Sequence, residues 1–177
     1  MPEDTNIYMA EASYGAVLAY GSETAGSALY RIDENGTINR IHVCSETGSQ
    51  VIKALRLSGD RGYAVAEYIR SREGEYHTRL VVLSSDGIMP RFTDTVPGII
   101  RQLARSDEES FTAVFLQEVQ PIPQLPYISS IWMDMETIDI RYDTDLDIIW
   151  RRKIDQYKGS LRPDIVIVSS EDKLLIG

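Results

Sequence analysis

Three aspartates at alternating positions have the spacing of metal ligands. Asp143, Asp145 and Asp147 lie in the segment YDTDLDII, residues 142 to 149. The D-x-D-x-D spacing opens a calcium loop, which also needs Gly at the sixth position and Glu at the twelfth. Isoleucines occupy both positions, which excludes an EF-hand loop. Three interpretations stay open: a divalent cation held by the three carboxylates, a solvated acidic face of an extended strand, or a contact with a basic partner.

Both tryptophans of the chain enclose an acidic segment. Between them the sequence places several carboxylates, and aromatic anchors inside a charged rim are typical of protein interfaces. The alternative is ordinary burial of both rings in a core. The partner-binding candidates in this segment are Trp132, Asp134, Glu136 and Trp150.

A proline-rich stretch precedes this segment. Pro123 and Pro126 form a P-x-x-P pattern within QPIPQLPY. Such a pattern can bind as a polyproline ligand. Between two expected strands it favours a stiff surface loop that protrudes far enough to contact a partner.

Few residues of the chain suit covalent or acid–base catalysis. The two histidines, His42 and His77, fall in or beside expected strands, where a hydrogen-bonded role is commoner than a catalytic one. Cys44 shares a strand face with His42, yet a nucleophilic thiol needs a lowered pKa and an accessible pocket. The sequence contains no hydrolase, zinc-protease or P-loop motif. A buried, unreactive thiol is therefore expected.

Short strands joined by tight turns carry these residues. Asn35-Gly36 and Asp86-Gly87 each lie between apolar runs, and these dipeptides tolerate the positive φ of both central residues of a two-residue hairpin. The run before each hairpin, YGAVLAY or GYAVAEYI, is almost continuously apolar, as expected of a strand buried on both faces. The segment 146–159 is the best helix candidate, although its apolar positions also suit a strand.

The strand pattern repeats along the chain. At an offset of 48, Ala64-Val65 falls on Ala16-Val17 and Tyr63 on Phe111, and LYRIDENGTINRI echoes LVVLSSDGIMPRF at an offset of 51. A period of 40 to 50 residues with several strands is that of propeller blades. The single all-β domain, residues 1–177, then divides into copies at about 6–50, 51–98 and 99–160, with a partial copy at 161–177.

The repeated pattern of apolar strand, S-x-D, second strand and LYRID-x-NG hairpin resembles the β-propeller repeats of the TolB and WD40-like class. The resemblance covers most of residues 6 to 118 and the last dozen, without the Trp-Asp or Gly-His signature. It implies about three and a half four-stranded antiparallel blades. The alternative fold is a β-sandwich or β-meander. For the incomplete last blade, the N-terminal segment NIYMAEA is expected to supply one strand.

Composition limits the partners and the compartment. The net charge of −9 argues against general nucleic-acid binding, with a weak basic patch, residues 151–153, as the local exception. No apolar run is long enough for a membrane span, and the acidic N-terminus lacks the apolar core of a signal peptide. The single cysteine forms no internal disulfide. We expect a soluble cytoplasmic or otherwise intracellular protein.

Three functions follow from the expected architecture. The first is a non-catalytic protein–protein interaction or scaffolding module, whose incomplete propeller is closed by another chain or another copy. The second is a divalent-metal-binding propeller, possibly a hydrolase, in which carboxylates such as Glu67, Asp107, Glu118 and Asp172 converge. The third is a structural component of a large assembly. No cofactor is expected apart from a possible divalent cation.

Overall fold

The computed structural model describes most of the chain as strands and turns. The described residues are 6–13, 15–23, 26–44, 48–59, 61–70, 76–84, 90–93, 96–118, 135–154, 166–168 and 174–176. None of them is helical, so the fold is all-β and the segment 146–159, as far as it is described, is a strand. None of them forms a helix that could cross a membrane.

Each sheet is an antiparallel meander in which every strand pairs with the next one along the chain. Sheet 1 contains β1 (Asn6–Ser13), β2 (Ala16–Glu23), β3 (Gly26–Ile32) and β4 (Ile38–Cys44). Sheet 2 contains β5 (Gln50–Arg56), β6 (Tyr63–Arg70), β7 (Tyr76–Leu83) and β8 (Arg91–Phe92), and β9 (Val96–Pro97) also pairs with β7. Sheet 3 contains β10 (Ile99–Arg105), β11 (Ser110–Glu118), β12 (Met135–Asp143) and β13 (Ile148–Ile154). A separate pair joins β14 (Val166–Val168) to β15 (Leu174–Ile176).

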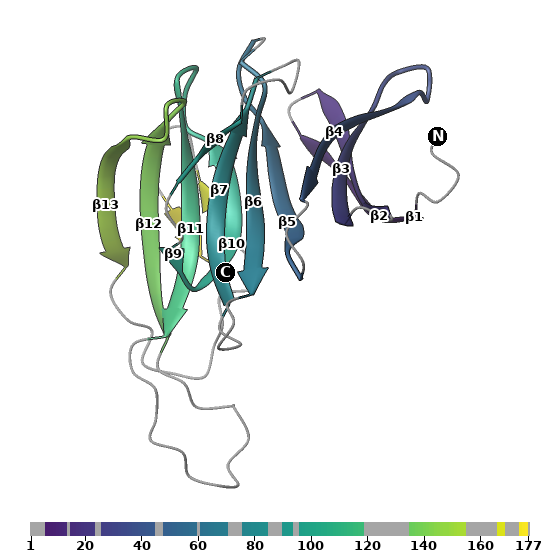
Figure 1. The fold of residues 1–177 in the computed structure, drawn as a ribbon. Helices are drawn as coiled ribbons and strands as arrows, with labels where there is room; N and C mark the ends of the chain where they lie inside the picture. The colour runs from purple at the N-terminus through teal and green to yellow at the C-terminus, as the bar shows by residue number, and fades with distance from the viewer. Residues whose placement is uncertain are drawn as a thin grey trace, which may run out of the picture.

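Each of the three sheets is built from one continuous stretch of the chain, residues 6–44, 50–97 and 99–154. Figure 1 shows them side by side in chain order, with sheet 1 on the right and sheet 3 on the left. The second strand of each sheet carries the buried apolar run, and β14 and β15 form the two strands of the partial copy. The propeller itself stays a prediction, because the described residues do not include a closed ring.

The strand register corrects the sequence alignment of the copies. In each sheet the first strand has a bulge near its start, at Tyr8, Ile52 and Arg101. When residues are counted from the bulge of each sheet, Tyr63 of sheet 2 corresponds to Phe111 of sheet 3, as expected. In sheet 1 the corresponding residue is Val17. The offset of 48 between the first two copies was therefore wrong by two residues, because the β1–β2 connection is shorter than the β5–β6 connection.

One further expectation about strand pairing was wrong. The N-terminal strand does not complete the last copy, because β1 pairs with β2 inside sheet 1.

The β3–β4 hairpin is also wider than the expected two-residue turn. Gly36 has φ +79°, but Asn35 does not have positive φ. The carboxylate of Asp33 accepts the backbone N–H groups of Asn35 and Thr37 at 2.9 and 2.8 Å. Asp33 therefore fixes a five-residue loop, and glycine is needed only at its fourth position.

The three sheets stack in one direction, which gives each sheet a face A and a face B. Face B is the side that packs on the following sheet, and face A is the side that packs on the preceding one. Leu18, Tyr20 and Leu29 on face B of sheet 1 share a core with face A of sheet 2. Face B of sheet 2 shares a second core with face A of sheet 3, where Phe111 stacks on Tyr142 at 5.7 Å between ring centroids.

Hydroxyl groups of sheet 1 satisfy the open backbone edge of β5. The N–H groups of Val51, Ala54 and Arg56 donate to Ser27 Oγ, Tyr20 Oη and Ser13 Oγ at 3.0, 2.9 and 3.0 Å. Two of these three bonds are fully buried. An unpaired buried N–H group is costly, so these side chains fix sheet 2 against sheet 1.

We expect Tyr20→Phe to lower the free energy of unfolding by roughly 1–3 kcal/mol, because the buried Ala54 N–H loses its acceptor. Urea unfolding followed by fluorescence measures the change. Tyr63→Phe is the matched control, since no hydrogen bond of its hydroxyl is found among the described residues. A Tyr20→Phe protein as stable as the control would contradict this role.

Candidate protein-interaction site

Face A of sheet 1 has no sheet packed on it within the described part of the chain. Ala19, Ala28 and Tyr30 form its buried centre, and partly buried apolar residues surround them: Ile7, Ile32, Ile38 and Val43. At its edge Val17 is 40% exposed, and Ala10 and Ala12 are exposed beside it. The face is therefore apolar, with a buried centre and an exposed apolar edge at Val17, Ala10 and Ala12.

The same ladder positions are buried in the other two sheets. The cross-strand pair Val17–Ile32 of sheet 1 corresponds to Tyr63–Leu83 in sheet 2 and to Phe111–Tyr142 in sheet 3. The next pair of sheet 1, Ala19–Tyr30, corresponds to Val65–Val81 in sheet 2 and to Ala113–Ile140 in sheet 3. All eight matching residues of sheets 2 and 3 are buried against the preceding sheet. Face A of sheet 1 is thus the one face A among the described sheets that lacks this cover.

The charges on this face are paired with each other. The Tyr30 hydroxyl donates to Glu23 Oε1 at 2.6 Å, and Arg40 Nη1 donates to Glu23 Oε2 at 2.9 Å. The bond from Tyr30, more than the cation of Arg40, holds the pKa of Glu23 below its usual value despite some desolvation. The face therefore presents apolar atoms and one neutralised pair to a partner.

A buried ionic cluster links sheet 1 to sheet 2. Glu67 on β6 is fully buried and lies between His42 of β4 and Arg79 of β7. His42 Nε2 lies 2.5 Å from Glu67 Oε1, and Arg79 Nε and Nη2 donate to Glu67 Oε2 at 2.9 and 2.6 Å. Burial alone raises the pKa of Glu67, but the bonds from His42 and Arg79 outweigh it and lower the pKa.

This cluster is a structural contact between sheets. Both oxygens of the carboxylate are occupied by cationic or imidazole nitrogens, and Cys44, on the same face of β4 as His42, is buried. Of the two histidines, His42 therefore has the hydrogen-bonded role that the sequence favours.

The three alternating aspartates form a hairpin loop and not an extended strand. Asp143 Oδ1 accepts the N–H groups of Asp145 and Asp147 at 2.8 and 2.9 Å, the same pattern as at Asp33. Leu146 has φ +70° at the position that Gly36 occupies in the other loop. Asp145 forms an ion pair with Arg91. The prediction that the three carboxylates line one face of an extended strand was wrong, because the carboxylate of Asp143 accepts backbone N–H groups of the loop.

The metal prediction gains no support from the described residues, in which no group of three or more His, Cys, Asp or Glu side chains could hold an ion. Of the four carboxylates expected to converge, Glu67 is paired as above. Asp107 caps the β10–β11 turn through Ser110 and Glu109 and pairs with Arg141. Burial raises the pKa of Asp107, but these bonds outweigh it and hold the pKa below its usual value. The side chains of Glu118 and Asp172 lie outside the described residues.

Most of the partner-binding candidates lie outside the described residues as well. This holds for Pro123, Pro126, Trp132 and Asp134, and for the side chain of Glu136, whose backbone belongs to β12. Trp150 is half-buried on β13, and the guanidinium of Arg152 lies 4.7 Å from the centroid of its ring. The interface prediction for this segment stays a prediction.

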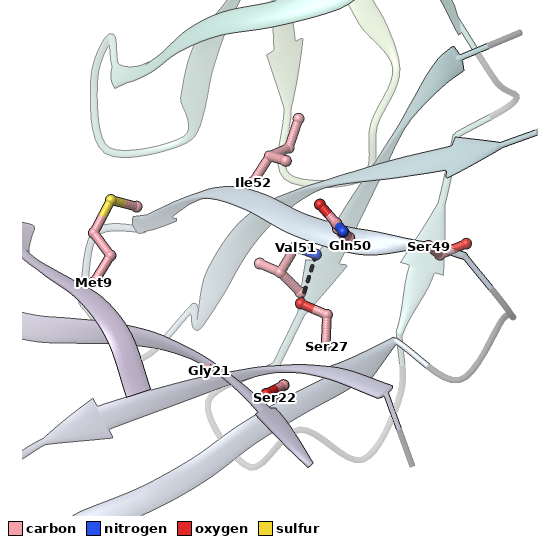
Figure 2. A pocket seen from close by; sticks show the side chains of 8 residues that line it. All are labelled: Met9, Gly21, Ser22, Ser27, Ser49, Gln50, Val51 and Ile52. Atoms are coloured by element: carbon pink, nitrogen blue, oxygen red, sulfur yellow. Dashed lines mark hydrogen bonds between the residues drawn. The ribbon is translucent and has the colours of Figure 1, made fainter. Parts of the chain in front are cut away.

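A pocket of about 390 Å³ opens between sheet 1 and β5 (Figure 2). Its lining consists of Met9, Gly21, Ser22, Ser27, Ser49, Gln50, Val51 and Ile52. None of these side chains is a titratable acid, a base or a cysteine. Ser27 already accepts the Val51 N–H group, as Figure 2 shows. The lining offers serine hydroxyls but no side chain among these eight that could act as their general base.

Comparison of the chain with protein-family models, curated proteins and solved structures found no match. The site is therefore defined by its own geometry.

Sequence reasoning missed face A of sheet 1. Its residues resemble those of any strand core, and one sequence cannot show which of three equivalent faces lacks a cover. A correct register would have helped, because it gives the small residues Ala19, Gly21 and Ala28 larger counterparts in sheet 2, namely Val65, Glu67 and Arg79. Gly21 cannot be larger, since a Cβ there would lie 2.7 Å from the Asn6 carbonyl oxygen.

We expect Glu67→Gln to lower the free energy of unfolding at pH 7 by roughly 3 kcal/mol, because it removes the carboxylate that pairs with the partly buried Arg79. The lowered pKa means that the ionised carboxylate stabilises the fold above pH 4.5, its ordinary pKa, and that this stability is lost as the pH falls through the folded-state value. Urea unfolding between pH 3 and 7 measures both effects.

The control for that experiment is Glu109→Gln, a highly exposed carboxylate that pairs with Arg61. It should leave stability and its acid dependence unchanged. Equal acid dependence in wild type and Glu67→Gln would show that Glu67 does not carry this linkage.

We expect Asp33→Ala and Asp143→Ala each to cost about 1 kcal/mol of stability, because each loses two hydrogen bonds to loop N–H groups. Asp145→Asn removes only an exposed ion pair and should stay within about 0.5 kcal/mol of wild type. Thermal unfolding with and without calcium checks this. A calcium-dependent rise in stability that Asp145→Asn abolishes would favour the metal site instead.

Proposed function

We propose that this chain is a non-catalytic protein-interaction module that binds a partner through face A of sheet 1. The observation that carries the proposal is the equivalence of the three faces A. Two of them are covered by the preceding sheet, whereas the third has no sheet packed on it in the described part of the chain and exposes Val17 at the position of the buried Tyr63 and Phe111. Exposed apolar faces of this kind are typical of interaction sites.

The partner is a β-sheet that presents a face of type B, supplied by a different protein chain. This follows from continuity with the two interfaces inside the chain, in which face A always packs on face B. A second copy offers a poorer face, because face B of sheets 1 and 2 is covered and face B of sheet 3 carries the ion pair between Asp139 and Arg152.

The backbone of β1 adds a polar requirement. Ala10 and Ala12 occupy the positions of Ala54 and Arg56, whose N–H groups bind hydroxyl side chains of the preceding sheet. A partner that docks in the same way therefore carries serine or tyrosine hydroxyls opposite β1. The assembled propeller-like arc is then a scaffold whose loops are free to hold further proteins.

The experiment is site-specific photo-crosslinking in the native source, with the photoreactive amino acid at position 17 and, as control, at position 34 in the exposed β3–β4 loop. We expect a crosslink to a different chain from position 17 alone. We also expect Val17→Arg to reduce recovery of that chain at least about tenfold, because a desolvated cation opposes docking. Glu34→Arg should have no effect.

Two outcomes would contradict the proposal. A monomeric chain that gives no crosslink from position 17 would remove the interaction itself. A crosslink from position 17 to another copy would replace the partner sheet by a homodimer in which two faces A pack together.

A further inference from the structure

The outer strand of sheet 3 is the second open surface of the molecule. Among the described strands β13 pairs only with β12, so the backbone groups along its other edge have no strand beside them. Its counterpart in sheet 2, β8, has only two residues, whereas β13 has seven. Proteins commonly shorten edge strands to prevent pairing with other chains. Sheet 3 lacks that protection.

Two neighbouring isoleucines point out of this strand. Ile148 and Ile149 are 56% and 52% exposed, more than any other large hydrophobic residue in the described part of the chain. The β12–β13 register explains why both are exposed. It shifts between Tyr142, which pairs with Ile148, and Arg141, which pairs with Trp150, so that Ile149 is a bulge residue. β-branched side chains at such an edge favour an added strand.

The rest of β13 is cationic, and its cations differ in role. Arg152 is held on one side by Asp139, with Nε and Nη2 at 2.8 and 2.7 Å from Oδ2, and by the ring of Trp150. Arg151 and Lys153 lie on the other side of the strand, opposite Ile140 and Ile138, and both are exposed. Two cations at alternate positions therefore line the open edge of a chain whose net charge is −9.

We propose that β13 binds an extended acidic segment of a partner protein as an added antiparallel strand. Backbone hydrogen bonds supply the pairing, as in other cases of strand addition. Carboxylates at alternate positions of the partner lie on the side of Arg151, and the apolar residues between them lie on the side of Trp150. A second copy of β13 is a poorer partner, because it brings three more cations to the same edge.

The probes are a fluorescein-labelled heptapeptide of alternating glutamate and valine and its lysine–valine counterpart. Fluorescence anisotropy of the full chain measures binding. We expect saturable binding of the glutamate peptide only, weakened at least about tenfold by Arg151→Glu. Arg61→Glu makes the same charge change at an exposed site on the β5–β6 connection and should stay within about twofold of wild type. Arg151→Gln, a milder change, replaces Arg151→Glu if that protein fails to fold.

Hydrogen exchange distinguishes strand addition from simple charge attraction. Amides of residues 148–154 should exchange more slowly with the glutamate peptide bound, whereas those of sheet 1 should not change. Absence of saturation up to roughly 1 mM, equal binding of both peptides, or unchanged exchange in β13 would overturn the proposal. So would Arg151-dependent binding of a single-stranded oligothymidine in place of the peptide, or self-association that Arg151→Glu abolishes.

Discussion

Burial of one sheet face on the next is the constraint on which the rest of this structure depends. Each meander of four or five strands has two apolar faces, and a sheet with both faces in water is not stable by itself. The chain solves this by stacking its sheets in one direction, so that each face B covers the next face A. Among the described residues no sheet packs on the first face A of the stack, and Val17 is exposed at a position that is buried as Tyr63 and Phe111 in the other copies.

Polar groups decide how the sheets are aligned in this stack. The Glu67 cluster and the hydroxyl contacts of Tyr20 and Ser27 all lie between sheets 1 and 2. At the Glu67–Arg79 position, sheet 3 has the apolar pair Phe115–Ile138. A buried ion pair adds little stability compared with an apolar pair of similar size. An alignment that separates its two charges is costly, because each charge is then buried without its partner. The ion pair therefore favours one alignment of sheet 2 on sheet 1, whereas sheet 3 packs on sheet 2 through apolar side chains at the equivalent position.

The strands and their grouping could be predicted from the sequence because period-two burial and turn residues are local signals. The apolar run of β6 and the hairpin at Asn35-Gly36 are examples. The strand register and the similarity of the β12–β13 loop to the β3–β4 loop could not be predicted. Leu146 stands where glycine is expected, so DTDLD was not recognised as the equivalent of DENGT, and its aspartates suggested a metal site. Long-range information was also missing: nothing local indicates that Glu67 meets His42, or which of three similar faces lacks a neighbour.

The two open surfaces have different chemistry and belong to different ends of the stack. Face A of sheet 1 is apolar with its charges paired, so it suits a permanent sheet-on-sheet contact of the kind found twice inside the chain. The edge of β13 is cationic and offers mainly backbone groups, so salt weakens its binding and a partner there exchanges more readily. Sheets 1 and 3 lie on opposite sides of sheet 2 (Figure 1), and neither partner would block the other. A chain with one permanent and one exchangeable contact is suited to holding a recruited protein against a larger assembly, and this arrangement requires no catalytic group.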